Sequence, residues 1–139
     1  MYRKILLPMD LGDEHGEVFD AAIPLLAPED GALVILHVIE AISGLSPQES
    51  EEFYAPLRER AQEHFAEWSE ELGKRGMTAR CESRVGKRGP TVVRYAIEEE
   101  CDLIVVTSRA ADPERPGWGF GTTSHQVALM APCSVLLVR

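Results

Sequence analysis

The sequence predicts an α/β fold, in which helices cover both faces of a parallel β-sheet. Short, continuously apolar runs alternate along the chain with longer segments of helical periodicity. The runs lack a polar face, which is typical of strands buried on both sides in a parallel sheet. With 139 residues, 45% of them apolar and 27% charged, the chain is expected to form a single domain over residues 1–139.

Five segments are predicted as strands. The first two, 4–9 and 32–38, and the last two, 102–107 and 134–139, are short apolar runs. The third, 77–85, alternates instead, with apolar side chains on one face and Arg and Glu on the other. Alternation indicates a half-exposed strand at an edge of the sheet.

The first two helices are predicted at 14–27 and 51–72. Pro24 lies inside the first and is expected to kink or shorten it, since proline removes a helix hydrogen bond. The second is expected to be a long amphipathic helix with one buried stripe. That stripe consists of Phe53, Leu57, Ala61, Phe65, Trp68 and Leu72.

The other two helices are predicted after the third and fourth strands. Pro90 is expected at the first helical position, and Ile97 is expected to face inward with Val92, Val93 and Ala96. The acids at 98–100 oppose the helix dipole, so we expect them to serve only solubility. The last helix runs from about Thr122 to Met130 and is followed by Pro132.

Charge and hydropathy exclude several classes of protein. A net charge of −9 and a pI near 4.9 argue against a broad nucleic-acid or anionic-membrane surface. The N-terminus leads into a strand without a signal peptide, and no apolar run approaches the ~20 residues that would span a membrane. We therefore expect a cytoplasmic protein that neither binds nucleic acid nor inserts into a membrane.

Two loops are expected to meet at the carboxyl edge of the sheet. Ligands of such sheets bind where the strand order reverses, and the first and fourth strands are neighbours there if the two halves wind in opposite directions. The loops would be Met9–Asp13 and Thr107–Gly121. Gly121 and three hydroxyl residues then open the last helix, which would direct backbone N–H groups at an anion.

Five segments, in their order and spacing, resemble the universal stress protein family over essentially the whole chain. They are Lys4–Asp10, Leu36–Val38, Gly89–Pro90, Asp102–Val106 and Ala131–Val138. The resemblance implies a three-layer sandwich around a five-stranded parallel sheet of order 3-2-1-4-5. This fold is Rossmann-like, of the adenine nucleotide alpha-hydrolase-like type.

Some family members bind ATP or a related nucleotide, and others do not. Binding members are similar to one pattern: glycine, two residues, glycine, nine residues, then glycine followed by Ser or Thr. Here Gly121–Thr122 keeps the last part of the pattern. Thr107 and Ala110 stand at the first two glycines, and ten residues separate Ala110 from Gly121. Thr107 is the larger change, because its branched Cβ would lie beside the ribose.

The resemblance implies ATP or AMP as the ligand, with Mg²⁺ if the ligand is ATP. It places Asp10 near the adenine and ribose, while Arg109 and Arg115 either supply phosphate charge or are solvated. Gly121–Thr122 either contacts phosphate or only caps the helix. The candidate site residues are Pro8, Asp10, Val38, Thr107, Arg109, Ala110, Gly121, Thr122 and Thr123.

Other candidate chemistry leaves alternatives open. His37 and His125 either contact a ligand or are structural, and Trp118 either covers the cleft, fills it or packs on the neighbouring helix. Ser108 and Ser124 lack a nucleophile motif, so no hydrolase triad is predicted. A weak ATPase would need Asp10 or Asp13 to orient water.

The family resemblance implies a small dimeric module of the stress response. The last strand, Val135 to Val138, is its expected pairing edge, since an exposed apolar edge strand needs a partner or a cover. A regulatory protein partner is also implied, without a signal for its identity. The alternative is an interaction protein of the same fold that binds no nucleotide, with its cleft closed by loop 108–120.

Overall fold

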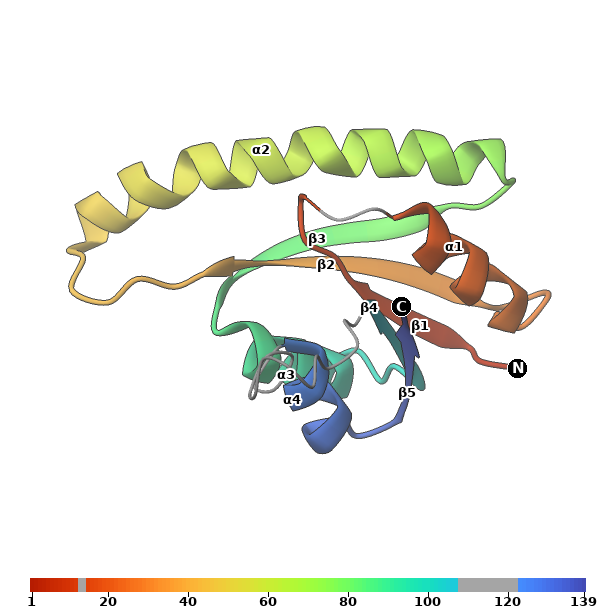
Figure 1. Cartoon of the computed structure of the whole chain (residues 1–139). Coiled ribbons are helices and arrows are strands. Elements are labelled where there is room, and N and C mark those ends of the chain that lie inside the picture. The colour runs from red at the N-terminus through yellow and green to blue at the C-terminus, as the bar shows by residue number, and fades with distance from the viewer. Residues whose placement is uncertain (13–14, 108–122) are drawn as a thin grey trace, which may run out of the picture.

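The computed structural model describes residues 1–12, 15–107 and 123–139. Strands and helices alternate along these residues, as the sequence predicts (Figure 1). The strands are β1 (Lys4–Pro8), β2 (Ala32–Glu40), β3 (Ala79–Gly86), β4 (Leu103–Thr107) and β5 (Ser134–Val138). The helices are α1 (Gly16–Ala22), α2 (Pro47–Lys74), α3 (Arg88–Glu98) and α4 (Thr123–Met130), and a short 3₁₀ helix, η1, spans Ile23–Leu25.

The five strands form one sheet in the order β3-β2-β1-β4-β5. Every neighbouring pair is parallel, which confirms the predicted order. The central strand, β1, pairs Ile5 with Leu33 of β2 on one side and with Leu103 of β4 on the other. The strand order therefore reverses between β1 and β4, where a ligand site is expected.

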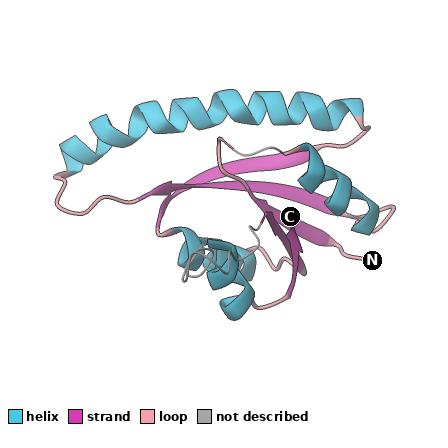
Figure 2. Ribbon diagram, in the orientation of Figure 1, coloured by secondary structure: helices cyan, strands magenta, loops and turns pink. Residues whose placement is uncertain are grey.

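Two hydrophobic layers pack on opposite faces of the sheet. Ile5 and Leu7 lie in one layer with Phe65 and Trp68 of α2. Leu6 lies in the other, beside side chains from α3 and α4. Figure 2 shows α1 and α2 on one side of the sheet and α3 and α4 on the other. This arrangement confirms the three-layer sandwich. Because helices cover both faces of the central strands, the sequences of these strands are continuously apolar.

The helix predicted at 14–27 is shorter in the structure. The α-helix ends at Ala22 and continues as the 3₁₀ turn η1, which contains Pro24. This confirms the expected effect of Pro24, whose ring is incompatible with an uninterrupted α-helix.

Helix α2 begins at Pro47, four residues before the predicted start at Glu51. The hydroxyl of Ser46 accepts a hydrogen bond from the backbone N–H of Glu49 at 3.1 Å and caps the helix. The sequence carries this signal, since Ser followed three residues later by Glu is typical of a capping box, and Pro47 occupies a favoured first position.

The predicted stripe of α2 is confirmed from Ala61 to Leu72 and is wrong at its N-terminal end. Phe53 is 39% exposed, whereas Tyr54 is buried. The Tyr54 hydroxyl accepts a hydrogen bond from the backbone N–H of Ile42 at 2.9 Å. Figure 1 shows the N-terminal turns of α2 running past the end of the sheet toward the loop after β2. At this end of α2, contact with the loop rather than with the sheet determines that Tyr54 is buried and Phe53 is exposed.

Three expectations for α3 are also wrong. The helix begins at Arg88, so Pro90 is its third residue, a position where proline is still tolerated because that N–H has no intrahelical partner. Ile97 is 59% exposed instead of facing inward. The acids at the end of the helix do more than serve solubility, since Glu98 and Glu99 pair with basic residues of β3 and β1.

The ion pairs at the end of α3 are short. Glu98 lies 2.6 Å from Nη1 of Arg84, and Glu99 lies 2.8 Å from Nη2 of Arg80 and 3.1 Å from Nζ of Lys4. The hydrogen bonds from Lys4 and Arg80 lower the pKa of Glu99 below its ordinary value. These pairs tie the end of α3 to two strands.

Within the described part of the chain, no helix is long and apolar enough to cross a membrane.

Candidate functional site at the carboxyl edge of the sheet

A cavity of about 60 Å³ lies beyond the carboxyl ends of β1 and β4, between the sheet and the first turns of α3 and α4. This is the point where the strand order reverses, so the cavity lies where parallel α/β sheets usually bind ligands. The residues that line it are Pro8, Met9, Asp10, Leu36, Val38, Arg88, Val92, Val106, Thr107, Thr123 and Ser124.

One wall of the cavity is apolar. Val38 of β2 and Val106 of β4 are buried side chains of the layer between the sheet and helices α3 and α4. Val92 extends this wall from α3, where it is also buried. A flat apolar ring laid against these branched side chains would lose its water-exposed surface, which favours binding.

Hydroxyl groups also line the cavity. Thr107 is the last residue of β4, and Thr123 and Ser124 begin α4. The first N–H groups of a helix have no intrahelical acceptor, and the helix dipole makes this end partly positive. Thr123 therefore combines a hydroxyl with a helix terminus that favours anions.

Close packing of α3 on α4 brings their first turns to the same cavity. A Cβ atom at Gly89 would lie 3.0 Å from Cβ of Gln126, closer than ordinary contact. Glycine at this position therefore allows the start of α3 to approach α4. As a result, Arg88 and Thr123 both line the cavity.

Two ion pairs that share Arg88 lie on the exposed side of the cavity. Nη1 of Arg88 is 3.7 Å from Oδ2 of Asp10, and Nε of Arg88 is 3.4 Å from Oε2 of Glu40. The three side chains are between 45% and 60% exposed. Both distances exceed the 2.7–2.9 Å usual for a charge-assisted hydrogen bond, so these are loose surface pairs.

The loop that carries Asp10 is held from the other face of the sheet. The backbone N–H of Met9 donates to the carbonyl of Leu36, and the carbonyl of Met9 accepts a hydrogen bond from Nδ1 of the buried His37, both at 2.9 Å. A carbonyl only accepts, so this bond places the proton on Nδ1. His37 thus fixes the residue before Asp10 and does not line the cavity.

Five of the predicted site residues lie together around this cavity: Pro8, Asp10, Val38, Thr107 and Thr123. The other four, Arg109, Ala110, Gly121 and Thr122, fall outside the described residues, as do Asp13, Arg115 and Trp118. Thr107 stands at the edge of the cavity with its branched Cβ, where the family pattern has glycine.

Sequence reasoning missed Arg88, because the helix after the third strand was expected to begin only at Pro90. A signal was present, because two basic residues follow the end of the third strand and precede a helix. At such a position, a side chain reaches the edge where ligands bind.

The described residues offer no ready-made metal site. Among them, no group of three or more His, Cys, Asp or Glu side chains is placed to hold a metal ion. Asp10 is the one carboxylate among the described residues that line the cavity. A Mg²⁺ ion is commonly held by one or two carboxylates together with nucleotide phosphates, so Asp10 fits a metal that arrives with ATP.

Comparisons with known proteins agree on one family. The model of the universal stress protein family matches residues 1–139. A universal stress protein of Methanothermobacter thermautotrophicus is 28% identical over 144 residues, which cover 100% of this chain and 97% of that protein. Universal stress protein UspA of Lactobacillus plantarum has a similar structure, with a TM-score of 0.76, 24% identity, and coverage of 99% and 98% of the two chains.

Two further structures of this fold hold adenine nucleotides. A universal stress protein in complex with cAMP has a TM-score of 0.65 and 23% identity, with coverage of 99% of this chain and 97% of that chain. A family member from Arabidopsis thaliana with AMP bound also has a TM-score of 0.65, at 15% identity, with coverage of 97% and 90%. At such identities, the likeness establishes the fold.

Proposed function

Given that the chain belongs to the universal stress protein family, we propose that it is a regulatory binding module of the stress response whose cavity takes ATP or AMP. The observation that carries this proposal is the convergence of Asp10, Val38, Thr107 and Thr123 on one cavity where the strand order reverses. The AMP and cAMP complexes of structurally similar proteins support the ligand class.

Each part of the cavity suits one part of an adenine nucleotide. The apolar wall of Val38 and Val106 suits the base, because burial of an aromatic ring needs no hydrogen bond on its faces. The carboxylate of Asp10 accepts hydrogen bonds and therefore suits the ribose hydroxyls. The start of α4, with Thr123, suits a phosphate.

A competing function is favoured by the size of the cavity. Its volume of about 60 Å³ is far below the 300–1,000 Å³ typical of small-molecule sites. An interaction protein of the same fold that binds no nucleotide would need no larger space. A slow ATPase is less well supported, because Asp10, the one carboxylate among the described residues that line the cavity, lies beside Arg88.

Equilibrium dialysis with labelled AMP and ATP, with and without Mg²⁺, separates these functions. We expect retention of nucleotide by the wild-type protein and weaker retention by the variant Asp10→Asn. Asp30→Asn is a matched control, since Asp30 is exposed and does not line the cavity. No retention at millimolar nucleotide would overturn the proposal and leave the competing function.

We also propose that the protein is a homodimer paired through β5. The strand lies at an edge of the sheet, and its Leu137 is 43% exposed. An apolar edge strand offers unpaired backbone groups and a hydrophobic surface to a second copy. Sedimentation velocity is expected to show a dimer at micromolar concentration, and a monomer in the variant Leu137→Lys. A wild-type monomer would contradict the proposal.

A further inference from the structure

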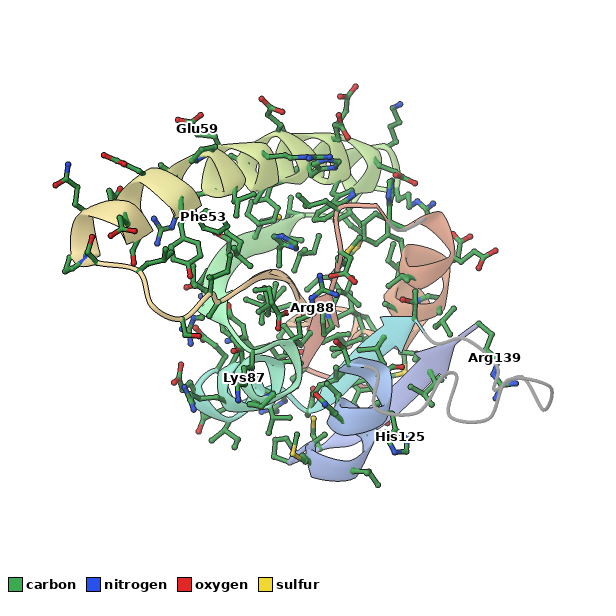
Figure 3. All side chains as sticks on the ribbon, turned by 60° about the vertical axis from the view of Figure 1, so that its left-hand side comes forward. Phe53, Glu59, Lys87, Arg88, His125 and Arg139 are labelled. Atoms are coloured by element: carbon green, nitrogen blue, oxygen red, sulfur yellow. The ribbon has the colours of Figure 1, made fainter. Side chains whose placement is uncertain are left out.

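Arg88 is the one positively charged side chain among the described residues that line the cavity. It is the first residue of α3, and Figure 3 shows it in the space between the two helical layers, with Lys87 over α3 instead. The rest of the described lining is apolar, hydroxylic or, in Asp10, negatively charged. The described part of the cavity thus combines a single guanidinium with hydroxyl groups and one carboxylate.

The present partners of Arg88 do not hold it firmly. The contacts to Asp10 and Glu40, at 3.7 and 3.4 Å, are longer than the pair that Arg84 makes with Glu98 at 2.6 Å. The Arg88 side chain is 45% exposed, so water screens both contacts. A stronger anion at the cavity would therefore displace either carboxylate at small cost.

We propose that Arg88 determines the specificity of this cavity for phosphorylated nucleotides over nucleosides. A phosphate bound at the start of α4, which lines the same cavity as Arg88, draws the guanidinium away from Asp10 and Glu40. The planar fork of an arginine suits phosphate oxygens, with two parallel hydrogen bonds. This inference rests on the proposed nucleotide function and deepens it.

The exchange of partners has a second effect, on Asp10. While Arg88 lies beside Asp10, the guanidinium partly offsets the negative charge of the Asp10 carboxylate. When a phosphate takes Arg88, the guanidinium no longer faces Oδ2 of Asp10, so the carboxylate becomes a stronger acceptor for hydrogen bonds from ligand hydroxyls. The phosphate therefore strengthens the binding of the sugar, which an unphosphorylated nucleoside cannot do.

Isothermal titration of adenosine, AMP and ATP against the wild type and Arg88→Gln tests the inference. We expect Arg88→Gln to weaken AMP and ATP binding about tenfold or more, the usual range for a lost hydrogen bond to a charged group. Adenosine affinity is expected to stay the same or to rise, because the nucleoside carries no anion for Arg88 to bind and Asp10 no longer has the guanidinium beside it.

Lys87→Gln is the matched control, since it removes the same charge from the neighbouring residue, which is exposed and does not line the cavity. It is expected to leave the AMP to adenosine ratio unchanged. Glu40→Gln acts in the opposite direction, because it removes a competitor for Arg88, and is expected to strengthen AMP binding.

The possible results separate the two proposals. Failure of the wild type to bind any of the three ligands overturns the nucleotide function and this inference with it. Nucleotide binding with an unchanged AMP to adenosine ratio in Arg88→Gln overturns the role of Arg88 alone. So does an equal change of that ratio in Lys87→Gln, which would indicate a general effect of charge.

Discussion

The Asp102 side chain joins the starts of two neighbouring strands, β1 and β4. Its two carboxylate oxygens accept hydrogen bonds from the backbone N–H groups of Arg3 and Lys4, each at 2.9 Å. Arg3 directly precedes β1, and Lys4 is the first residue of that strand. The start of β4 is thereby fixed against the start of β1, and both strands lead to the cavity.

The pH dependence of this contact follows from the pKa of Asp102. Partial burial raises that pKa, but the backbone hydrogen bonds from Arg3, Lys4 and Asp102 itself, with the charge of the N-terminus, together outweigh burial and leave the pKa below the usual 3.8. A lowered folded-state pKa stabilises the fold above the unfolded-state pKa, and the stabilisation is lost as the pH falls through the folded-state value. The contribution is therefore present at pH 7 and absent well below 3.8.

We predict that Asp102→Asn lowers the free energy of unfolding by about 1 kcal/mol at pH 7, the usual net value of a hydrogen bond. The difference from the wild type should shrink as the pH falls from 7 to well below 3.8, where the wild-type carboxyl becomes protonated. Urea denaturation at both pH values measures it. Asp30→Asn is the control, and an equal loss in that variant would show an effect of net charge only.

At the scale of elements, α2 has two ends with different attachments. Ser46 caps the N-terminal end, which runs past the sheet (Figure 1). Leu72 near the C-terminal end is fully buried in the layer that contains Phe65 and Trp68. Local stability varies with such burial, so the two ends should respond differently to mutation.

Loss of the cap is predicted to act locally. Ser46→Ala removes the hydrogen bond to Glu49, and N-caps contribute about 1 kcal/mol. Because the first turns are poorly buried, faster amide exchange is expected at residues 48–53, with a change in global stability below about 0.5 kcal/mol. Ser43→Ala, in the exposed loop before the helix, is the control. Unchanged exchange at 48–53 would mean that the cap does not hold this turn.

Truncation at the other end is predicted to act globally. Leu72→Ala removes a fully buried side chain and leaves a space in the layer between α2 and the sheet. Such changes cost about 2–5 kcal/mol, so the midpoint of urea denaturation should fall markedly with its slope retained. Leu129→Ala, on a side chain that is 74% exposed, should leave the midpoint nearly unchanged. A loss below about 1 kcal/mol in Leu72→Ala would contradict its assignment to the core.

The elements also show what the sequence could predict. The parallel sheet and the meeting of the loops after β1 and β4 followed from continuous apolar runs, because parallel strands end at one edge of the sheet. The strand order and the place of Val38 in the site followed from the family resemblance. The sequence could not predict that Tyr54 rather than Phe53 is buried, because both residues fit a helical stripe. A contact of Tyr54 with the loop after β2 determines which of them is covered. Glu99 was misjudged because its partner Lys4 lies 95 residues away in sequence.

At the scale of the whole molecule, the cavity exists only when both halves of the sheet are in place. Its lining comes from β1, β2, β4, α3 and α4, so the unfolded chain cannot offer it. A ligand that binds only the folded state stabilises that state in proportion to the logarithm of its concentration. Nucleotide binding must therefore appear as a rise in the melting temperature.

The expected rise can be estimated. At a ligand concentration of 100 times Kd, the stabilisation is about 2.7 kcal/mol. For a domain of 139 residues, each kcal/mol raises Tm by roughly 3–5 °C, which gives roughly 8–13 °C with AMP. Differential scanning calorimetry should show Tm rising with the logarithm of AMP concentration in the wild type and in Asp30→Asn, and a smaller rise in Asp10→Asn. An equal rise in Asp10→Asn would place the nucleotide elsewhere on the molecule, since Asp10 lines the cavity and Asp30 does not.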